Sequence, residues 1–198
     1  MSSDHQCSLL LASRSPRRVE LLQQIGVDFR MCAVDIDEQR RREESPEKFV
    51  LRLARAKAGA AQCEADHMAV LGADTIVTLG GNVFGKPRDL NHALSMWSKL
   101  SGATHEVYTA VALCHGGSTD VVLSKSKVTF RTISLAEQEA YWRSNEPCDK
   151  AGGYAIQGLG AVFITRLEGS YSGVMGLPLC ETASLLAHIG ISPVLGRL

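Results

Sequence analysis

Apolar and polar positions along the chain follow two periods, which predict strands and helices in turn. Short continuous apolar runs bounded by turn residues predict strands at residues 8–12, 29–34 and 68–79. Apolar positions at helical spacing, each set preceded by helix-starting residues, predict helices at residues 16–25, 45–61 and 91–100. The first half of the chain is therefore expected to alternate strand and helix.

The second half shows a different order of elements. Two long strands are expected at residues 104–113 and 121–132, joined as a hairpin around a GGST turn. The elements predicted after them are a helix at 135–144, a glycine-rich loop at 151–160, a strand at 161–167, a loop at 169–178 and a helix at 179–189. These patterns predict one α/β or α+β domain over residues 1–198, with a mixed sheet, a groove between two halves and a flexible extension at residues 1–8.

Composition and charge narrow the class of protein. With 198 residues, 45% of them hydrophobic, the chain can bury a sizeable core. The 21 Lys and Arg residues balance the 21 Asp and Glu residues, which argues against a non-specific nucleic-acid binder but allows a local basic pocket. No apolar stretch is long enough to span a membrane, and the N-terminus does not resemble a signal peptide. We therefore expect a cytoplasmic protein.

The cysteines and histidines carry no metal-binding or disulfide pattern. The six cysteines are scattered without a CxxC motif, so small hydrophobic side chains in a reducing compartment are favoured over a disulfide framework or a zinc site. The six histidines form neither HxH nor HExxH, which disfavours a histidine-ligated metal.

The turn SRSPRR, between the first strand and the first helix, has the residues of an anion site. A strand–turn–helix unit directs free backbone N–H groups and the positive end of a helix dipole at the space before the helix. Ser13 adds a hydroxyl, and Arg17 and Arg18 lie where positive charge is unfavourable unless an anion is present. The alternative is a solvated turn with ion pairs to Glu20 or Asp35. The P-loop pattern is absent.

Two charged residues interrupt apolar patterns. Lys57 continues the apolar stripe of Leu53 and Val50, so it either extends along the helix to solvent, the commoner case, or meets an anion in a cleft. Asp74 lies in an apolar strand, where a carboxylate is costly without a partner. It either makes a structural hydrogen bond or faces a site after a bend at Gly72, where it can bind Mg²⁺ or deprotonate water.

Three further stretches can take part in the same chemistry. Asp35, Asp37 and Glu38 form an acidic turn that is either a solvated charge run or a site for a hard cation such as Mg²⁺ or Mn²⁺. Lys86 lies between a glycine and a proline, and it is either a phosphate ligand or a turn residue. The loop DKAGGYAIQGLG permits close approach of a flat ligand, and Gln157 there can both donate and accept hydrogen bonds. Together these residues fit a nucleoside triphosphate with a divalent cation.

Several stretches closely resemble one known family, the Maf family of nucleotide pyrophosphatases. They are SRSPRRVELL, VDIDE, LARAKA, GADTIV, GKPRD, SGATHEVYTAVAL, DKAGGYAIQGLG and GLPLCET, and they cover residues 9–189 in the order and spacing of the family. The resemblance implies an elongated α/β fold similar to that of inosine triphosphatases, in which two lobes flank a central cleft. It also implies a protein that often forms a homodimer.

The resemblance further implies hydrolysis of a nucleoside triphosphate to the monophosphate and pyrophosphate, with Mg²⁺ or Mn²⁺. SPRR, GADT and AIQG resemble the branch that acts on dTTP and UTP. A sister branch, which acts on 7-methyl-GTP, differs at the positions of the three residues that the resemblance makes specificity residues: Arg17, Thr75 and Gln157. Asp74 becomes the catalytic proton acceptor. The implied phosphate ligands are Ser13, Arg18, Lys57 and Lys86, and the implied metal ligands are Glu38 and Asp74.

Other functions stay open at this point. The same chemistry can act on a modified nucleotide such as 7-methyl-GTP. The chain can also be a nucleotide-binding regulator of septum formation with little turnover, although a pure sensor needs no base. A nucleic-acid binder using Arg40–Arg42 is disfavoured by the zero net charge.

Overall fold

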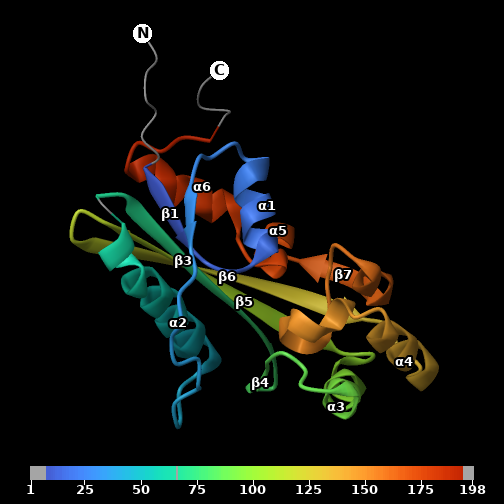
Figure 1. Ribbon diagram of the computed structural model, residues 1–198. Coiled ribbons are helices and arrows are strands. Elements are labelled where there is room, and N and C mark those ends of the chain that lie inside the picture. Colours follow the sequence, from blue (N-terminus) through green and yellow to red (C-terminus); the bar gives the residue numbers. More distant parts are fainter. Residues whose placement is uncertain (1–7, 66, 194–198) are drawn as a thin grey trace.

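One mixed sheet runs through the computed structural model, which describes residues 8–65 and 67–193 (Figure 1). Its seven strands lie in the order β2-β1-β3-β5-β6-β7, and β4 pairs with β3. β1 is parallel to β2 and to β3, whereas the other pairs are antiparallel. The predicted mixed α/β sheet is thus confirmed. The strands are β1 (Leu9–Ala12), β2 (Arg30–Cys32), β3 (Ala69–Leu79), β4 (Asn82–Phe84), β5 (Thr104–His115), β6 (Ser118–Phe130) and β7 (Ile164–Glu168).

The helices cover both faces of the sheet. In the described residues they are α1 (Pro16–Gln24), α2 (Pro46–Ala60), α3 (Leu90–Leu100), α4 (Leu135–Arg143), α5 (Tyr171–Met175) and α6 (Leu179–His188). Short 3-10 turns add η1 (Gln62–Glu64), η2 (Glu146–Asp149), η3 (Ala151–Gly153) and η4 (Leu159–Phe163). None of the helices within 8–65 and 67–193 is both long and apolar enough to cross a bilayer.

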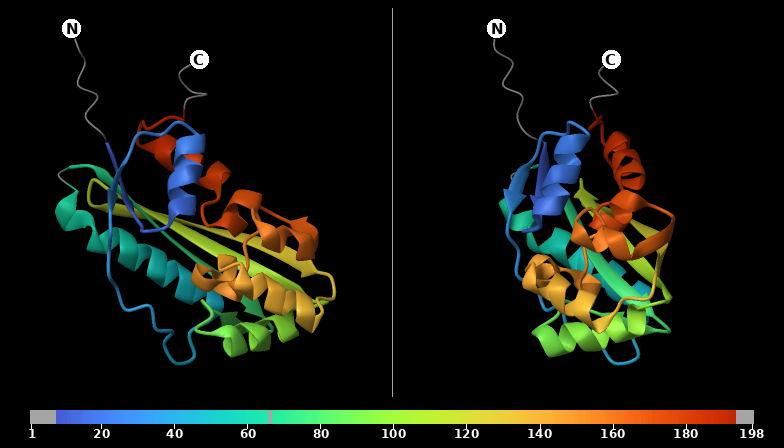
Figure 2. Two further views of the ribbon diagram at one scale, coloured as in Figure 1. Left: turned by 45° about the vertical axis from the view of Figure 1, so that its right-hand side comes forward. Right: turned by 90° about the vertical axis from the view of Figure 1, so that its right-hand side faces the viewer.

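Three apolar clusters give the molecule its elongated form with a helical group at each end (Figure 2). α2 packs its apolar stripe, including Val50 and Leu53, along one face of the sheet. On the other face, α1 and α6 cover the end formed by β1 and the start of β3. At the far end of that face, α3 and α4 pack around Trp97 and Phe130. The long strands β3, β5 and β6 connect the two ends (Figure 1).

The order of the first strands creates a topological switch point. β1 lies between β2 and β3, and the helices that lead to these two neighbours, α1 and α2, pack on opposite faces of the sheet. In open α/β sheets a crevice forms outside the carboxyl ends of strands at such a point. Ser13 and the arginine-rich turn follow β1 at this position.

Several element boundaries differ from the sequence-based predictions. The strand expected at 29–34 is confined to β2, and residues 161–163 belong to η4 rather than to a strand. Strand β4 was not predicted, and the loop expected at 169–178 contains α5. Each missed element is three to five residues long, too short for an apolar period to be recognised. Of the expected extension at residues 1–8, only Ser8 belongs to the described residues.

The five cysteines in the described part of the chain carry free thiols. Cys32 and Cys114 are buried, as expected for small hydrophobic side chains. The other three are exposed, which that expectation did not foresee: Cys63, Cys148 and Cys180.

Candidate active site

A gap in the sheet marks the candidate site. On one edge of β3, pairing with β1 ends at Gly72, and pairing with β4 begins at Val77. The intervening residues 73–76 therefore have a strand neighbour on the β5 side only. Because side chains alternate along a strand, Asp74 and Thr75 in this gap face opposite sides of the sheet.

A cavity of about 790 Å³ opens at this gap, a volume within the range of small-molecule ligand pockets. Its walls come from the β1–α1 turn, the acidic stretch before α2, α2 itself, β3, β4 and the loop from η2 to Gln157. All nine residues singled out by the resemblance line it, although they come from distant parts of the chain: Ser13, Arg17, Arg18, Glu38, Lys57, Asp74, Thr75, Lys86 and Gln157. The structure brings the nine together, and the role of each stays a prediction.

Lys57 forms the charged centre of this cavity. Its Nζ atom lies 2.7 Å from Oδ1 of Asp74 and 2.7 Å from Oε1 of Glu38. The Lys57 side chain is only 13% exposed, so it does not extend along the helix to solvent, which was the commoner expectation for a lysine on an apolar stripe. Instead the lysine turns inward, because two carboxylates offer it a partner.

The two carboxylates differ in their protonation behaviour. Burial raises the pKa of Asp74, and the charges of Lys57 and Arg18 oppose that rise without cancelling it. For Glu38, burial acts in the same direction, but the hydrogen bond and charge of Lys57, with Lys86 and Arg18, prevail and lower its pKa. The pKa values of two acids that contact the same lysine are thus shifted in opposite directions. Such a difference separates a proton acceptor from a group that stays ionised.

Gly72 explains how Lys57 comes to meet Asp74. A Cβ at Gly72 would lie 2.4 Å from the backbone nitrogen of Ala58 and 2.6 Å from the carbonyl oxygen of Ala54. The absent side chain lets α2 lie directly on β3. The expected bend at Gly72 is wrong: the residue is paired in register on both sides, with Ala12 and Ala112, and its role is to admit the helix.

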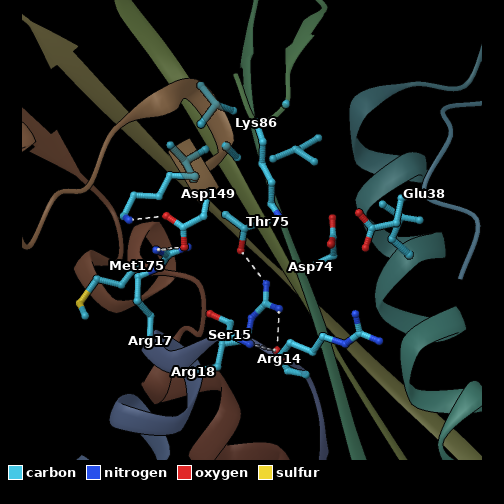
Figure 3. A pocket seen from close by; sticks show the side chains of 18 of the residues that line it. Arg14, Ser15, Arg17, Arg18, Glu38, Asp74, Thr75, Lys86, Asp149 and Met175 are labelled. Atoms are coloured by element: carbon cyan, nitrogen blue, oxygen red, sulfur yellow. Dashed lines mark hydrogen bonds and ion pairs between the residues drawn. The ribbon is translucent and has the colours of Figure 1, made fainter. Parts of the chain in front are cut away.

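Arg18 is fixed in one orientation by three acceptors. Its Nε donates to the carbonyl of Gly176 at 2.8 Å, and Nη1 donates to the hydroxyl of Ser13 at 3.2 Å. Nη2 donates to the hydroxyl of Thr75 at 3.3 Å (Figure 3). Burial lowers the pKa of this guanidinium, and the charge of Asp74 opposes the change. The arginine thereby connects the β1–α1 turn to β3 and to the segment after α5.

Arg17 has a partner that the sequence did not suggest. Its Nη1 lies 3.6 Å from Oδ2 of Asp149, which is part of η2 on the other side of the cavity (Figure 3). The expected local alternatives were Glu20 and Asp35. No short-range signal marks Asp149, because it is more than a hundred residues from Arg17 along the chain. Ser15 caps α1 without a side-chain hydrogen bond, and Ser15 and Pro16 both line the cavity, so the positive end of the helix faces it.

Lys86 and Gln157 complete the walls. Lys86 follows β4 and points toward Thr75 and Asp74 from the side opposite Arg18 (Figure 3). Gln157 is exposed at the rim, beside the apolar wall formed by Tyr154 and Ile156. A polyanion can therefore meet Arg17, Lys57 and Lys86 while an attached ring reaches the apolar wall.

The acidic stretch contributes unequally. Asp35 and Glu38 line the cavity, whereas Asp37 accepts a hydrogen bond from the backbone of Gln39 at 2.9 Å and lies outside the lining. Arg40 donates to the carbonyls of Glu44 and Gly81, away from the cavity.

The donor set of Glu38 and Asp74 fits a hard cation. Magnesium is commonly held by one or two carboxylates together with substrate phosphates and water. Within the described residues, no three His, Cys, Asp or Glu side chains gather as a ready-made cage. Glu38 and Asp74 direct one carboxylate oxygen each at the Lys57 ammonium, so the two side chains converge on one point of the cavity, as two ligands of a divalent ion would have to.

The fold and this cavity define an α/β protein with a cleft at a sheet switch point, and that cleft is lined by arginine and lysine side chains. The chain belongs to the Maf-like protein family, and the match to that family covers residues 8–189. It is 51% identical over 184 residues to the dTTP/UTP pyrophosphatase of Methylococcus capsulatus, covering 92% of this chain and 91% of that protein. It is 52% identical over 183 residues to the dTTP/UTP pyrophosphatase of Escherichia coli (strain K12), covering 91% and 92%.

Among solved structures, that of the Staphylococcus aureus Ham1 protein resembles part of this one. The match covers 62% of this chain and 71% of that chain, with 13% sequence identity and a TM-score of 0.43. The expected likeness to inosine triphosphatases stays a prediction.

Proposed function

We propose that this protein hydrolyses nucleoside triphosphates, dTTP and UTP foremost, to the monophosphate and pyrophosphate. The observation that carries the proposal is the placement of Asp74, with its raised pKa, in one cavity with Arg17, Lys57 and Lys86. The names of the relatives at 51% and 52% identity support the same reaction and substrates.

The reaction needs charge neutralisation, an oriented water and a proton acceptor. Arg17, Lys57 and Lys86 neutralise the phosphates. Asp74 takes a proton from a water molecule while the oxygen of that water bonds to the α-phosphorus. The bond between the α-phosphorus and the oxygen that bridges it to the β-phosphorus then breaks, which releases pyrophosphate. A divalent cation held by Glu38 and Asp74 would supply charge stabilisation on the phosphate oxygens.

The hydrogen bonds of the cavity support this assignment of the base. Lys57 donates to Asp74, and its positive charge opposes the rise that burial causes in the Asp74 pKa, so the lysine favours the ionised carboxylate. The raised pKa of Asp74 makes it the better proton acceptor of the two acids, because its proton affinity is closer to that needed at neutral pH. Glu38 remains ionised beside it.

Selectivity for uracil and thymine is assigned to the rim of the cavity. Both bases present an N3–H donor beside a carbonyl acceptor, and the amide of Gln157 can pair with both. Cytosine presents the reversed pattern, so an amide held in the orientation that suits uracil would leave polar groups unpaired, which is costly in a desolvated site. Thr75 and Arg17 line the same cavity, where they would set the position of the triphosphate.

The test is pyrophosphate release from dTTP, UTP, CTP, GTP and 7-methyl-GTP, each with Mg²⁺ and with Mn²⁺. Release dominated by dTTP and UTP is the expected result. Turnover of 7-methyl-GTP instead would retain Asp74 and overturn the specificity roles of Arg17, Thr75 and Gln157. Nucleotide binding without turnover by the folded protein would favour a regulator of septum formation.

We further propose a cytoplasmic homodimer, on the strength of the sequence resemblance. Light scattering coupled to size-exclusion chromatography tests the oligomeric state, and a monomer at micromolar concentration would contradict it.

A further inference from the structure

The turn that carries Gln157 is held at both ends by groups outside the cavity. Oε2 of Glu146 accepts the backbone N–H of Leu159 at 2.8 Å, and Oε1 accepts that of Gly160 at 3.0 Å. Both amides follow Gln157 in the chain. Glu146 itself does not line the cavity.

The other end of the turn is bound to the same carboxylate through Tyr141. The Tyr141 hydroxyl donates to Oε1 of Glu146 at 2.6 Å and accepts the backbone N–H of Ala155 at 3.1 Å. Ala155 lies two residues before Gln157, and Leu159 two residues after it. One tyrosine–glutamate pair therefore spans the turn.

The backbone lies directly against this carboxylate. A Cβ at Gly158 would be 2.2 Å from Oε2 of Glu146, so the next residue after Gln157 must be glycine for the contact to form. On the far side of Glu146, Lys150 Nζ donates to its carbonyl oxygen at 2.7 Å. The glutamate is thus fixed through both its side chain and its backbone.

The charge of Glu146 is kept by its donors. Burial alone would raise its pKa, but the Tyr141 hydroxyl and the two backbone N–H groups lower it. Burial and the hydrogen bond to Glu146 raise the pKa of Tyr141, so the phenol stays a donor. Hydrogen bonds to an ionised acceptor are stronger than those to a neutral one, so the three donors bound to Glu146 restrict the motion of the turn.

Glu146 also belongs to the segment that meets Arg17. It begins η2, and Asp149, which ends η2, pairs with Arg17. Lys150 donates to Asp149 at 2.6 Å and to the Glu146 carbonyl. The two ends of this one short turn thereby contact the Gln157 turn and Arg17.

We propose that Glu146, acting with Tyr141, is a positioning residue that sets the place of Gln157 and so determines base selectivity. The inference rests on the proposed function, because it requires that Gln157 contact the base. It assigns to η2 a role in substrate choice without contact with the substrate.

The test is a mutant cycle on base selectivity. Glu146→Gln puts an NH₂ group among N–H and O–H donors, and Tyr141→Phe removes the hydroxyl while keeping the ring. Each is expected to lower the ratio of kcat/KM for UTP over CTP about tenfold or more, since small displacements of contacting groups can cost up to about a hundredfold. In a Gln157→Ala background neither substitution should change the ratio further.

Glu137→Gln is the matched control. Glu137 also accepts from several donors, Arg131 and Ser134, but at the start of α4 and away from the cavity. It is expected to lower stability while leaving the UTP-over-CTP ratio and the hydrogen exchange of segment 155–160 at wild-type values. Glu146→Gln and Tyr141→Phe are expected to increase exchange in that segment.

Two outcomes separate the inference from the proposed function. A wild-type ratio in both folded variants, or a full additional loss in the Gln157→Ala background, would overturn the positioning role while leaving the pyrophosphatase reaction intact. If the wild type hydrolyses no triphosphate, the proposed function fails. In that case the difference in thermal shift between UTP and CTP is compared for the wild type and the two variants. A smaller difference in the variants supports the role of Glu146 in binding, and an unchanged difference overturns it.

Discussion

Oδ1 of Asp74 lies 2.7 Å from Nζ of Lys57 at the place where α2 crosses β3. Neither residue is near the other in sequence, and the contact exists because Gly72 admits the helix to the strand surface. The pair combines the proposed base with the cation that controls its charge, so its perturbation gives the most direct tests of the site.

Replacing Asp74 by Asn is expected to remove activity while preserving the fold. Asn keeps the shape but cannot accept the proton, so kcat should fall about a hundredfold or more. Folding stability near neutral pH should not fall. The folded-state pKa of Asp74 is raised, so its contribution to stability is fully present below the unfolded pKa and is lost as pH rises through the folded-state pKa. Pyrophosphate release and urea unfolding provide the two measurements.

The matched control for this variant is Asp120→Asn, an exposed aspartate on β6. It should leave both quantities unchanged. Wild-type turnover in a folded Asp74→Asn protein would exclude Asp74 as the proton acceptor.

Replacing Lys57 by Met is expected to move the pH profile. The lysine lowers the pKa of Asp74, so its removal lets burial raise that pKa further. The acid limb of kcat/KM against pH should move up by about one pH unit or more, the usual effect of a close opposite charge. An acid limb that stays in place, or moves down, would show that another group controls it.

Replacing Gly72 by Ala is expected to destabilise the protein by about 1–3 kcal/mol, because the new methyl group meets helix backbone that cannot rotate away. Activity should fall with stability, since α2 carries Lys57. Gly59→Ala on the same helix is the control: nothing lies within 4 Å of its Cβ position. That substitution should stabilise by about 0.5–1 kcal/mol, and the two signs can be compared by chemical denaturation. Equal stabilisation by both would refute the close approach.

The burial of His105 leads us to expect that the protein loses stability in mild acid. It is fully buried, with Nε2 on the Tyr154 hydroxyl at 2.8 Å, and burial lowers its pKa to about 4. Nδ1 has no hydrogen-bond partner within the described part of the chain. The unfolded state binds a proton near pH 6.5 and the folded state does not, so stability should decrease as pH falls from about 6.5 to 4.

The size of that decrease follows from the difference between the two pKa values, about 3 kcal/mol at most. Urea unfolding at pH 7 and pH 5 measures it, and His105→Gln should reduce the difference between the two. A variant as sensitive to acid as the wild type would assign the effect to other groups.

The sequence by itself determined the alternating elements and the set of residues at the site. Apolar periods and caps indicate strands β1 and β3 and helices α1, α2 and α3, because these signals act between neighbours or across one helical turn. The motifs around Arg17, Asp74 and Gln157 likewise lie within short stretches. The nine residues taken from these and the other family motifs all line one cavity.

Only the tertiary structure decided how those residues meet. The gap between β1 and β4 on the edge of β3, the inward turn of Lys57 and the pairing of Arg17 with Asp149 all join segments distant in the chain. Such contacts depend on strand order and on the closeness of helix to sheet. The period of a single segment does not encode either, so Glu146 and Asp149 carried no signal until the fold placed them beside the Gln157 turn and Arg17.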